Sequence, residues 1–471
     1  MWEHGRQRRW SRGGPEARRL GRVRFSSFQC VDIAQAMTPF IRFARWLVRR
    51  WAMCVVVAAF TTVLFVQRSG RRLHLGLPYV YSTDEPHYLT GLNSVLWDGD
   101  AELSNNYART NWGHVDTGIL RAGQLIDHHT YLPSFVGTVY PHSSLFGSFG
   151  VRADHDASGR RRPPVLRFPA DGALPLEYSW HPTYPFFLVA PLLSLLPRTA
   201  VEPVLLCLLS ALTGLAAWRF RELCTTLVPS GLYADLAMVG VFVGTPVLYY
   251  SRALFPECFF VILTVVACHA VMVRGRWFVA GLCFMLAAAL KPPAALLAVP
   301  ALLLLWRRDI RKSLLTFALV CVGVGFSFFE LRVLKGISKG GGRVAAERLF
   351  DVSHLNYMPW ANLFDRRFGL FTYAPVLAVA LLGWLPLCRR FPYESGALLA
   401  GVVLNFAFAC LIGFYGSSYG GRYLVPFIPL LGVGFAGIWL YPLLARRLLL
   451  VGFGALLVWS TLINLKGSLA L

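Results

Sequence analysis

Residues 183–197 read TYPFFLVAPLLSLLP, and this apolar run decides how the rest of the chain is oriented. It is short and is interrupted by Pro185 and Pro191, whereas a helix that crosses a bilayer needs about 20 apolar residues. If the run crosses a membrane, every later apolar run begins on the opposite side. The topology of the protein therefore depends on whether residues 183–197 span the membrane or lie at its surface.

The composition of the whole chain indicates a membrane protein. Hydrophobic residues make up 56% of the 471 residues and charged residues only 15%, with a mean hydropathy of +0.52. Backbone groups in lipid must be satisfied within each segment, and the alternating pattern of a β-barrel is absent from the sequence. We predict an all-α polytopic membrane protein with eleven spans, at residues 51–66, 201–218, 233–250, 253–272, 277–290, 293–306, 313–334, 370–387, 395–414, 423–443 and 448–465.

Positive charge favours the interpretation in which residues 183–197 do not cross. Arginine and lysine gather in cytoplasmic loops, and this interpretation puts nearly all clusters on the side of the N-terminus. We therefore predict a re-entrant or interfacial helix at 183–197, a cytoplasmic N-terminus and an external C-terminus. The clusters are Arg219 and Arg221, Arg274 and Arg276, Arg307 to Lys312, Arg389 and Arg390, and Arg446 and Arg447; the single cations on the other side are Arg252, Lys291 and Arg422.

The predicted topology divides the chain into an arm and a transmembrane domain. Residues 1–45 are basic and are expected to form a disordered cytoplasmic arm, with Met37 as an alternative start. Residues 46–465 are expected to form the transmembrane domain, with extracytoplasmic loops at 67–200 and 335–369. The formal charge of +22 lies mostly in the arm and the loop clusters, so it does not indicate a nucleic-acid partner. The ten cysteines avoid both outer loops and show no metal-binding spacing.

The first outer loop begins with an acid pair, Asp84-Glu85, within YSTDEPHYLTGLNSVLWDGD at 81–100. Asp84 could cap a short helix that follows, but this role does not require Glu85. The alternative is that the pair carries out chemistry beside a membrane pocket. With Asp98 and Asp100, the pair also offers oxygen ligands for a divalent metal. We expect no metal or other cofactor and weigh the metal site below a scheme that uses only cationic side chains.

Two further segments place polar side chains near the predicted outer ends of spans. His181, in YSWHPTYPFF, either packs at the membrane interface or orients a substrate. Arg252 and Glu257, in YYSRALFPECFF, bracket a proline. They either close the turn with a salt bridge, or Glu257 orients the arginine in a pocket.

The remaining two segments present cations at outer helix ends. Lys291 stands before two prolines in ALKPPAALL, and Arg422 follows a Gly- and Tyr-rich stretch, GFYGSSYGGRYLVPFIPLL, that includes Tyr419. Arginine binds phosphate through two parallel hydrogen bonds, which makes Arg422 a candidate phosphate ligand. The alternative is that these cations extend toward external lipid phosphates.

Taken in order, these segments resemble the GT-C class of membrane glycosyltransferases, in the branch of the protein O-mannosyltransferases and the lipid A aminoarabinose transferase. The resemblance rests on the order of DEPHY and WDGD, WHPTYPFF, SRALFPE, LKPP, GLFTYAPV and YGGRYLVPFIPLL, and covers most of the chain from about residue 45. The family more usually has a second proline after the histidine, where this chain has Thr183.

The resemblance implies a polyprenyl-phosphate sugar as donor and a hydroxyl of a lipid, glycan or protein as acceptor. It implies an inverting transfer at the extracytoplasmic face of a bacterial plasma membrane. Asp84 would be the general base, with Glu85 as its alternative or partner. The expected substrate-binding residues are Tyr88, His181, Arg252, Glu257, Lys291, Tyr419 and Arg422.

Two other functions fit the same composition. A transporter or flippase of a lipid-linked or anionic substrate would show repeats or broken helices with a site near the middle of the membrane. No clear repeat is visible in the sequence, and the polar residues gather at one rim. A catalytically silent lipid-binding protein with this fold is the second alternative.

Overall fold

The structure, a computed structural model, describes residues 50–63, 88, 92, 95–96, 111–112, 115–116, 124–125, 166–167, 184–196, 198–330, 352–366, 368–412 and 421–470. The chain divides into two compact units, Met1–Trp51 and Ala52–Leu471. Only Arg50 and Trp51 are described in the first unit, so the account below concerns the second. The arm at 1–45 and most of both predicted outer loops lie outside the described residues.

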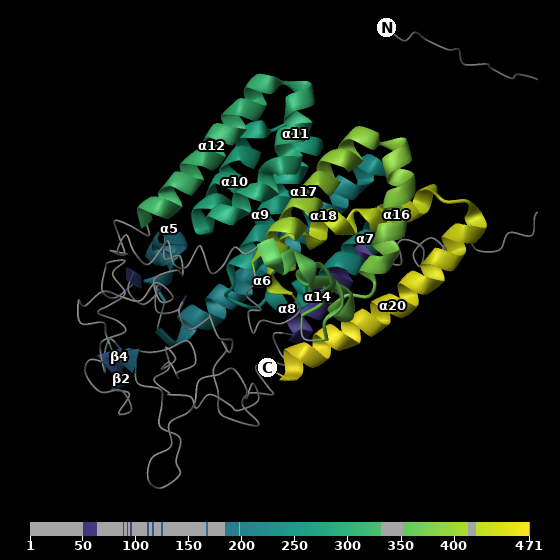
Figure 1. The fold of residues 1–471 in the computed structure, drawn as a ribbon. Coiled ribbons are helices and arrows are strands. Elements are labelled where there is room, and N and C mark those ends of the chain that lie inside the picture. The colour runs from purple at the N-terminus through teal and green to yellow at the C-terminus, as the bar shows by residue number, and fades with distance from the viewer. Residues whose placement is uncertain are drawn as a thin grey trace, which may run out of the picture. The chain divides into compact units, whose positions relative to one another are not determined.

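Helices make up almost all of the described part of the second unit (Figure 1). The exceptions are two antiparallel pairs of strands, in which each strand has two residues: β1 (Asn111–Trp112) pairs with β2 (Val115–Asp116), and β3 (Gln124–Leu125) pairs with β4 (Leu166–Arg167). The α-helices are α5 (Tyr184–Leu193), α6 (Arg198–Leu227), α7 (Gly231–Phe242), α8 (Val247–Tyr250), α9 (Pro256–Met272), α10 (Trp277–Leu290), α11 (Val299–Arg308), α12 (Ile310–Phe329), α14 (Met358–Phe364), α15 (Leu370–Tyr373), α16 (Leu377–Arg390), α17 (Pro392–Leu411), α18 (Ile428–Gly432), α19 (Gly434–Gly437) and α20 (Leu443–Ala470). Shorter 3-10 turns are η3 (Pro292–Ala298), η5 (Val352–Asn356), η6 (Arg422–Phe427) and η7 (Ile438–Leu440).

The prediction of an all-α polytopic membrane protein is confirmed. Five helical stretches in the described part are long and apolar enough to cross a membrane. Four shorter apolar helices, including one at Arg50–Val63, accompany them. The long stretches are Val204–Leu227, Ile310–Phe329, Pro392–Leu411, Arg422–Leu440 and Leu443–Leu465.

Several predicted spans are broken into pieces where prolines occur. The span predicted at 233–250 ends its first helix at Phe242 and resumes after Pro246. The span at 293–306 begins with the 3-10 turn η3, which starts at Pro292. Proline lacks a backbone N–H and clashes with the preceding turn, which disfavours a continuous α-helix at these positions.

Helix α5 is too short to cross a bilayer as one element. Its ten residues extend about 15 Å at 1.5 Å per residue, and Pro191 lies inside it. The re-entrant or interfacial placement of 183–197 relative to a membrane stays a prediction.

The predicted cytoplasmic clusters lie together at one end of the bundle. His269 Nε2 of α9 lies 2.8 Å from Glu222 Oε2 of α6, and Arg308 of α11 donates to the backbone oxygen of Val271 at 3.0 Å. We call this the basic end. Further contacts there are Arg307 with the Tyr393 ring, Arg446 with the Trp439 ring, Tyr233 with Trp439, and Arg221 with Asp235. The side of the membrane on which the basic end lies stays a prediction.

Close backbone contact holds α16 against α19. A Cβ added at Gly383 would lie 1.9 Å from the backbone oxygen of Gly434, and one at Gly437 would lie 2.0 Å from that of Gly383. Helices in membranes use such small residues because dispersion contacts, rather than hydrophobic burial, drive their association. These glycines therefore fix the spacing of the two helices.

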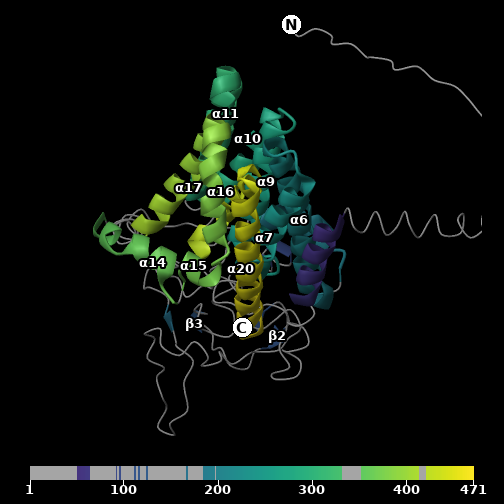
Figure 2. The same cartoon turned by 90° about the vertical axis from the view of Figure 1, so that its right-hand side faces the viewer.

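The last helix, α20, packs along the same part of the bundle (Figure 2). Ser460 of α20 accepts a hydrogen bond from the backbone N–H of Val376 at 3.1 Å, and Asn464 donates to the oxygen of Tyr373 at 2.9 Å. These two bonds connect α20 to the segment where α15 ends and α16 begins.

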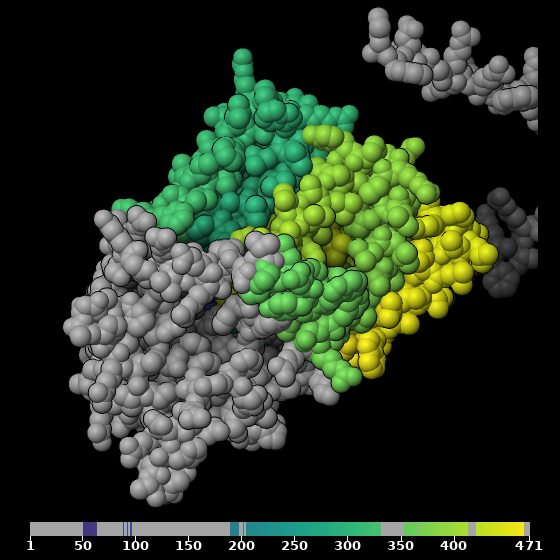
Figure 3. All heavy atoms as spheres, in the orientation of Figure 1, coloured from purple at the N-terminus to yellow at the C-terminus, as the bar shows by residue number. Residues whose placement is uncertain are grey.

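Helix α12 lies at the surface of the bundle (Figures 1 and 3). Its outer face exposes large apolar side chains, as expected for a face in contact with lipid. They are Leu314, Leu315, Phe317, Val322, Phe326, Phe328 and Phe329.

Candidate functional site

Three helix ends meet at the carboxylate of Glu257. Glu257 lies at the start of α9, the end of that helix farther from the basic end of the bundle. Lys291 Nζ lies 3.3 Å from Glu257 Oε1, and Arg422 Nε lies 2.9 Å from the same oxygen. These partners are separated from Glu257 by 34 and 165 residues in the sequence. We call Glu257, Lys291 and Arg422 the ionic trio.

Glu257 is held at the start of α9 by local sequence and by α6. Pro256 occupies the first turn, where its missing N–H costs nothing, and an acid in that turn is stabilised by the helix dipole. The hydroxyl of Ser210 on α6 donates to the backbone oxygen of Ser251 at 2.9 Å. Thr213 Oγ1, also on α6, lies 3.2 Å from Cys258 Sγ.

Lys291 lies at the break between α10 and η3. Its backbone is extended, with φ −149° and ψ 124°, as expected for a residue before proline. Pro292 and Pro293 begin η3, so the chain changes direction here. The break places the ammonium group beside Glu257.

Arg422 depends on the glycine that precedes it. Gly421 is left-handed, with φ 67° and ψ 57°, a conformation that glycine adopts without steric cost. A Cβ at this position would lie 2.5 Å from the backbone oxygen of Phe368. Gly421 therefore allows the backbone to pass close to Phe368, and η6 begins at the next residue, Arg422.

Aromatic rings lie beside the guanidinium groups of Arg422 and Arg252. The Arg422 guanidinium carbon lies 4.8 Å from the centroid of the Phe255 ring, and that of Arg252 lies 4.8 Å from the Tyr249 ring. Tyr88 packs edge-on against Phe255, with ring centroids 6.3 Å apart. Cations over aromatic faces are stabilised by the quadrupole of the ring. The rings therefore hold both guanidinium groups in fixed positions.

Two members of the ionic trio are buried. Glu257 is 1% exposed and Arg422 is 8% exposed, so neither charge is screened well by water. Lys291 and Arg422 share this one carboxylate, in keeping with the rule that buried charges are paired.

An apolar pocket borders the trio. It contains about 640 Å³ of empty space, including its open mouth. Two of its lining residues, Pro256 and Leu290, directly precede Glu257 and Lys291 in the chain. One side of the pocket is a row of leucines on α6, namely Leu205, Leu208, Leu209 and Leu212.

The structure brings together five of the predicted site residues. Glu257, Lys291 and Arg422 are in direct contact, and Tyr88 and Arg252 pack on neighbouring aromatic rings. Arg252 and Glu257 were considered as a possible salt bridge within SRALFPE. The two cations that contact Glu257 in the described part of the chain, Lys291 and Arg422, come instead from distant segments. Asp84, Glu85, His181 and Tyr419 lie outside the described residues, and their roles stay predictions.

Sequence reasoning missed Phe255 and the row of leucines on α6. Phe255 contacts both Arg422 and Tyr88, and its position between Arg252 and Glu257 was the available signal. The leucines give no signal of their own, because apolar residues fill every face of a membrane helix. In the described part, no three His, Cys, Asp or Glu side chains are grouped to hold a metal ion.

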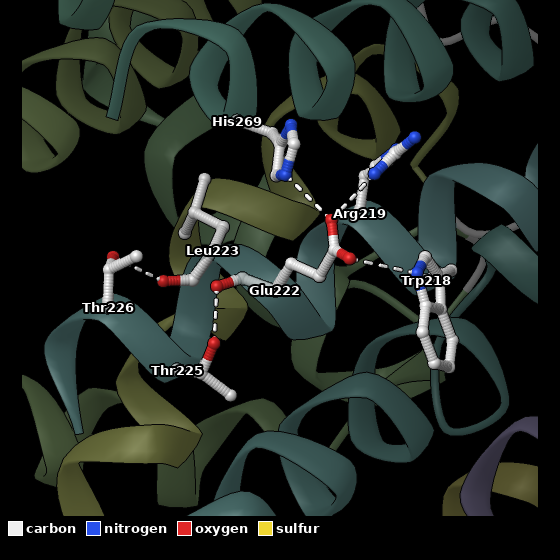
Figure 4. A network of polar contacts seen from close by, with 7 residues as sticks. All are labelled: Trp218, Arg219, Glu222, Leu223, Thr225, Thr226 and His269. Atoms are coloured by element: carbon white, nitrogen blue, oxygen red, sulfur yellow. Dashed lines mark hydrogen bonds and ion pairs between the residues drawn. The ribbon is translucent and has the colours of Figure 1, made fainter. Parts of the chain in front are cut away.

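A second polar network lies at the basic end (Figure 4). Glu222 Oε2 lies 2.7 Å from Arg219 Nη1 and 2.8 Å from His269 Nε2. Trp218 Nε1 donates to Glu222 Oε1 at 3.1 Å. This network joins α6 to α9, the two helices that also carry Ser210 and Glu257.

Comparison with known proteins gives a resemblance in structure. No protein-family model and no curated protein matches the sequence. The chain is similar to the crystal structure of ArnT from Cupriavidus metallidurans bound to undecaprenyl phosphate, at 12% identity and a TM-score of 0.44. The match covers 86% of this chain and 62% of that chain, so this chain matches less than two thirds of its length.

Proposed function

We propose that the protein is a membrane glycosyltransferase. It transfers a sugar from a polyprenyl-phosphate donor to an acceptor hydroxyl at the extracytoplasmic face. The observation that carries this proposal is the convergence of Lys291 and Arg422 on buried Glu257, next to an apolar pocket. Cationic groups beside an apolar pocket suit a ligand with an anionic head and a hydrocarbon chain.

The donor fits this layout in a single orientation. Its phosphate contacts Lys291 and Arg422, and its hydrocarbon chain follows the leucines of α6. Leu208 lines the pocket and is 42% exposed, so the pocket reaches the surface of α6 that faces lipid. The acceptor approaches from the side of the first outer loop.

The transfer needs a base for the acceptor and stabilisation of the leaving group. Asp84 takes the proton of the acceptor hydroxyl, whose oxygen attacks the anomeric carbon with inversion. The bond between that carbon and the phosphate oxygen breaks, and its electron pair stays on the phosphate. A general base contributes about 10²–10⁴-fold, and fixed cations stabilise the charge that develops on the phosphate. The role of Asp84, with Glu85 as alternative or partner, rests on the resemblance of the DEPHY segment.

The proposal is tested with purified protein in liposomes that contain radiolabelled polyprenyl-phosphate sugars and membrane-derived acceptors. Asp84→Asn is expected to lower transfer at least 100-fold while donor binding persists. Arg422→Ala is expected to abolish donor binding, and Arg390→Ala, exposed at the basic end, serves as the control for loss of one arginine. Unchanged transfer in Asp84→Asn would remove Asp84 from its role.

The same liposomes separate the alternatives. A flippase would move a fluorescent polyprenyl-phosphate sugar between leaflets without forming product. A lipid-binding protein would do neither. The location of the trio at one end of α9, rather than at its middle, favours the transferase.

A further inference from the structure

We propose that Phe255 is a positioning residue that couples the phosphate site at Arg422 to the first-loop segment at Tyr88. This inference rests on the proposed function, in which Arg422 contacts the donor and Asp84, four residues before Tyr88 in the sequence, acts on the acceptor. Phe255 acts through the side chains that pack on its ring and is not a catalytic residue.

The backbone of Phe255 is held on both sides of the residue. Phe255 is the N-cap of α9, with an extended backbone at φ −105° and ψ 143°. Its N–H donates to the oxygen of Ala253 at 2.7 Å, and its oxygen accepts from the N–H of Cys258 at 3.2 Å. Its neighbours in the chain, Leu254 and Pro256, line the apolar pocket. The backbone at the edge of the pocket therefore sets where the ring lies.

The ring of Phe255 contacts side chains from three parts of the chain. The Arg422 guanidinium carbon lies 4.8 Å from its centroid. Tyr88 packs edge-on against the ring at a centroid distance of 6.3 Å, and Tyr250 does so at 5.5 Å. Phe255 and Tyr250 are both fully buried. Protein interiors are closely packed, so the ring cannot shift without a response from these neighbours.

The first-loop segment packs through a face that includes Tyr88. Tyr88, Leu92 and Val95 are buried, and their spacing of four and then three residues is that of one face of a helix. Four residues of chain span at most about 14 Å, so the position of Tyr88 limits how far Asp84 can lie from the ring of Phe255. A contact that holds Tyr88 therefore also restricts the acid pair.

Binding of a phosphate should strengthen this connection. A phosphate that contacts Arg422 restricts the motion of its guanidinium group, which lies against the Phe255 ring. A restricted ring in turn restricts Tyr88, so a bound donor brings order to the segment that carries the acid pair. Ordering by one ligand lowers the entropic cost of the next ordering step, which here is the approach of the acceptor.

A buried ring with a purely structural role would behave differently. Its truncation would leave a cavity and lower stability, but the response of the first-loop segment to a bound phosphate would persist. Coupling instead predicts that the response is lost while phosphate binding remains. This response is the readout that separates the two roles.

The experiment measures hydrogen exchange of residues 81–96 in the full-length protein in nanodiscs, with and without saturating geranylgeranyl phosphate as the probe. In wild type, the probe is expected to slow exchange of this segment at least threefold. Phe255→Leu is expected to bind the probe within threefold of the wild-type affinity, measured by calorimetry, and to lose this protection.

Phe220→Leu is the matched control. Phe220 is also 1% exposed and packs edge-on against Phe242, with ring centroids 5.9 Å apart. It lies on α6 two residues before Glu222, at the basic end. This variant should keep both the binding of the probe and the protection of residues 81–96.

Wild-type protection in Phe255→Leu would overturn the inference, as would a loss of probe affinity greater than threefold. If Phe255→Leu does not fold, 3,4,5-trifluorophenylalanine at position 255 decides, because it keeps the ring and weakens the negative charge on the face that attracts Arg422. Its protection should fall at least twofold, and undiminished protection would contradict the coupling. Wild type that binds the probe without protection also contradicts it, whereas wild type that does not bind the probe counts against the proposed phosphate site.

Discussion

Replacement of Gly421 by alanine tests how Arg422 is placed. The alanine would have to adopt a left-handed backbone conformation at φ +67°, and its Cβ would lie 2.5 Å from the backbone oxygen of Phe368. The left-handed conformation costs about 1–2 kcal/mol for an L-residue, and overpacking against a rigid neighbour adds about 1–3 kcal/mol. We therefore expect Gly421→Ala to destabilise the protein by roughly 2–5 kcal/mol.

Gly275 provides a matched control for the backbone term. It has φ +63° in the turn between α9 and α10, and a Cβ there would have no neighbour within 4 Å. Gly275→Ala should thus cost only the left-handed term, about 1–2 kcal/mol. The difference between the two variants isolates the contact with Phe368.

Apparent unfolding temperature in detergent, followed by tryptophan fluorescence at one scan rate, measures the two effects. Gly421→Ala is expected to lower it further than Gly275→Ala, because only Gly421→Ala adds the overpacking term of about 1–3 kcal/mol. It should also weaken binding of geranylgeranyl phosphate, because η6 and Arg422 must shift, whereas Gly275→Ala should not. Equal changes in unfolding temperature, with intact binding in both variants, would refute the assigned role of Gly421.

Three further predictions concern other parts of the bundle. Glu222→Ala removes the carboxylate shared by Arg219 and His269. It should lower the free energy of unfolding by about 1–2 kcal/mol and leave the binding of geranylgeranyl phosphate unchanged. Gly383→Ala places a Cβ 1.9 Å from a backbone oxygen of α19, and should cost about 1–3 kcal/mol; an unchanged unfolding temperature would contradict the described spacing of α16 and α19. The hydrogen bond from Lys312 holds the pKa of the Asp309 carboxyl below its usual range. Asp309→Asn should therefore lower the unfolding temperature at neutral pH. The difference in unfolding temperature between the variant and wild type should disappear as the pH falls below about 4, because Asp309 then becomes protonated in wild type.

Much of the fold was predictable because helix formation in lipid is a local matter. Each span must satisfy its own backbone hydrogen bonds, so apolar runs and their prolines mark the helices and their breaks. Lys291 followed by two prolines indicates the break at η3, and the structure has it there. The arginine clusters likewise indicate which loops share one end of the bundle, because Arg and Lys concentrate in the loops on one side of a membrane.

The broken helices at 233–250 and 423–443 were less predictable. The sequence favours continuous spans there because apolar residues run on through the break points. Pro246 is the N-cap of α8, Pro426 lies inside η6 and Pro429 lies in the first turn of α18, but whether a proline bends, breaks or shortens a helix depends on its neighbours.

The sequence by itself determined the helical membrane class, the approximate spans and the set of residues from which a site could be drawn. Only the tertiary structure decided that Glu257 meets Lys291 and Arg422, and that Phe255 supports Arg422. The physical reason is that these contacts depend on the rotation and depth of several helices. Many small packing contacts set both, such as the glycines between α16 and α19, and no local pattern in the sequence encodes their sum.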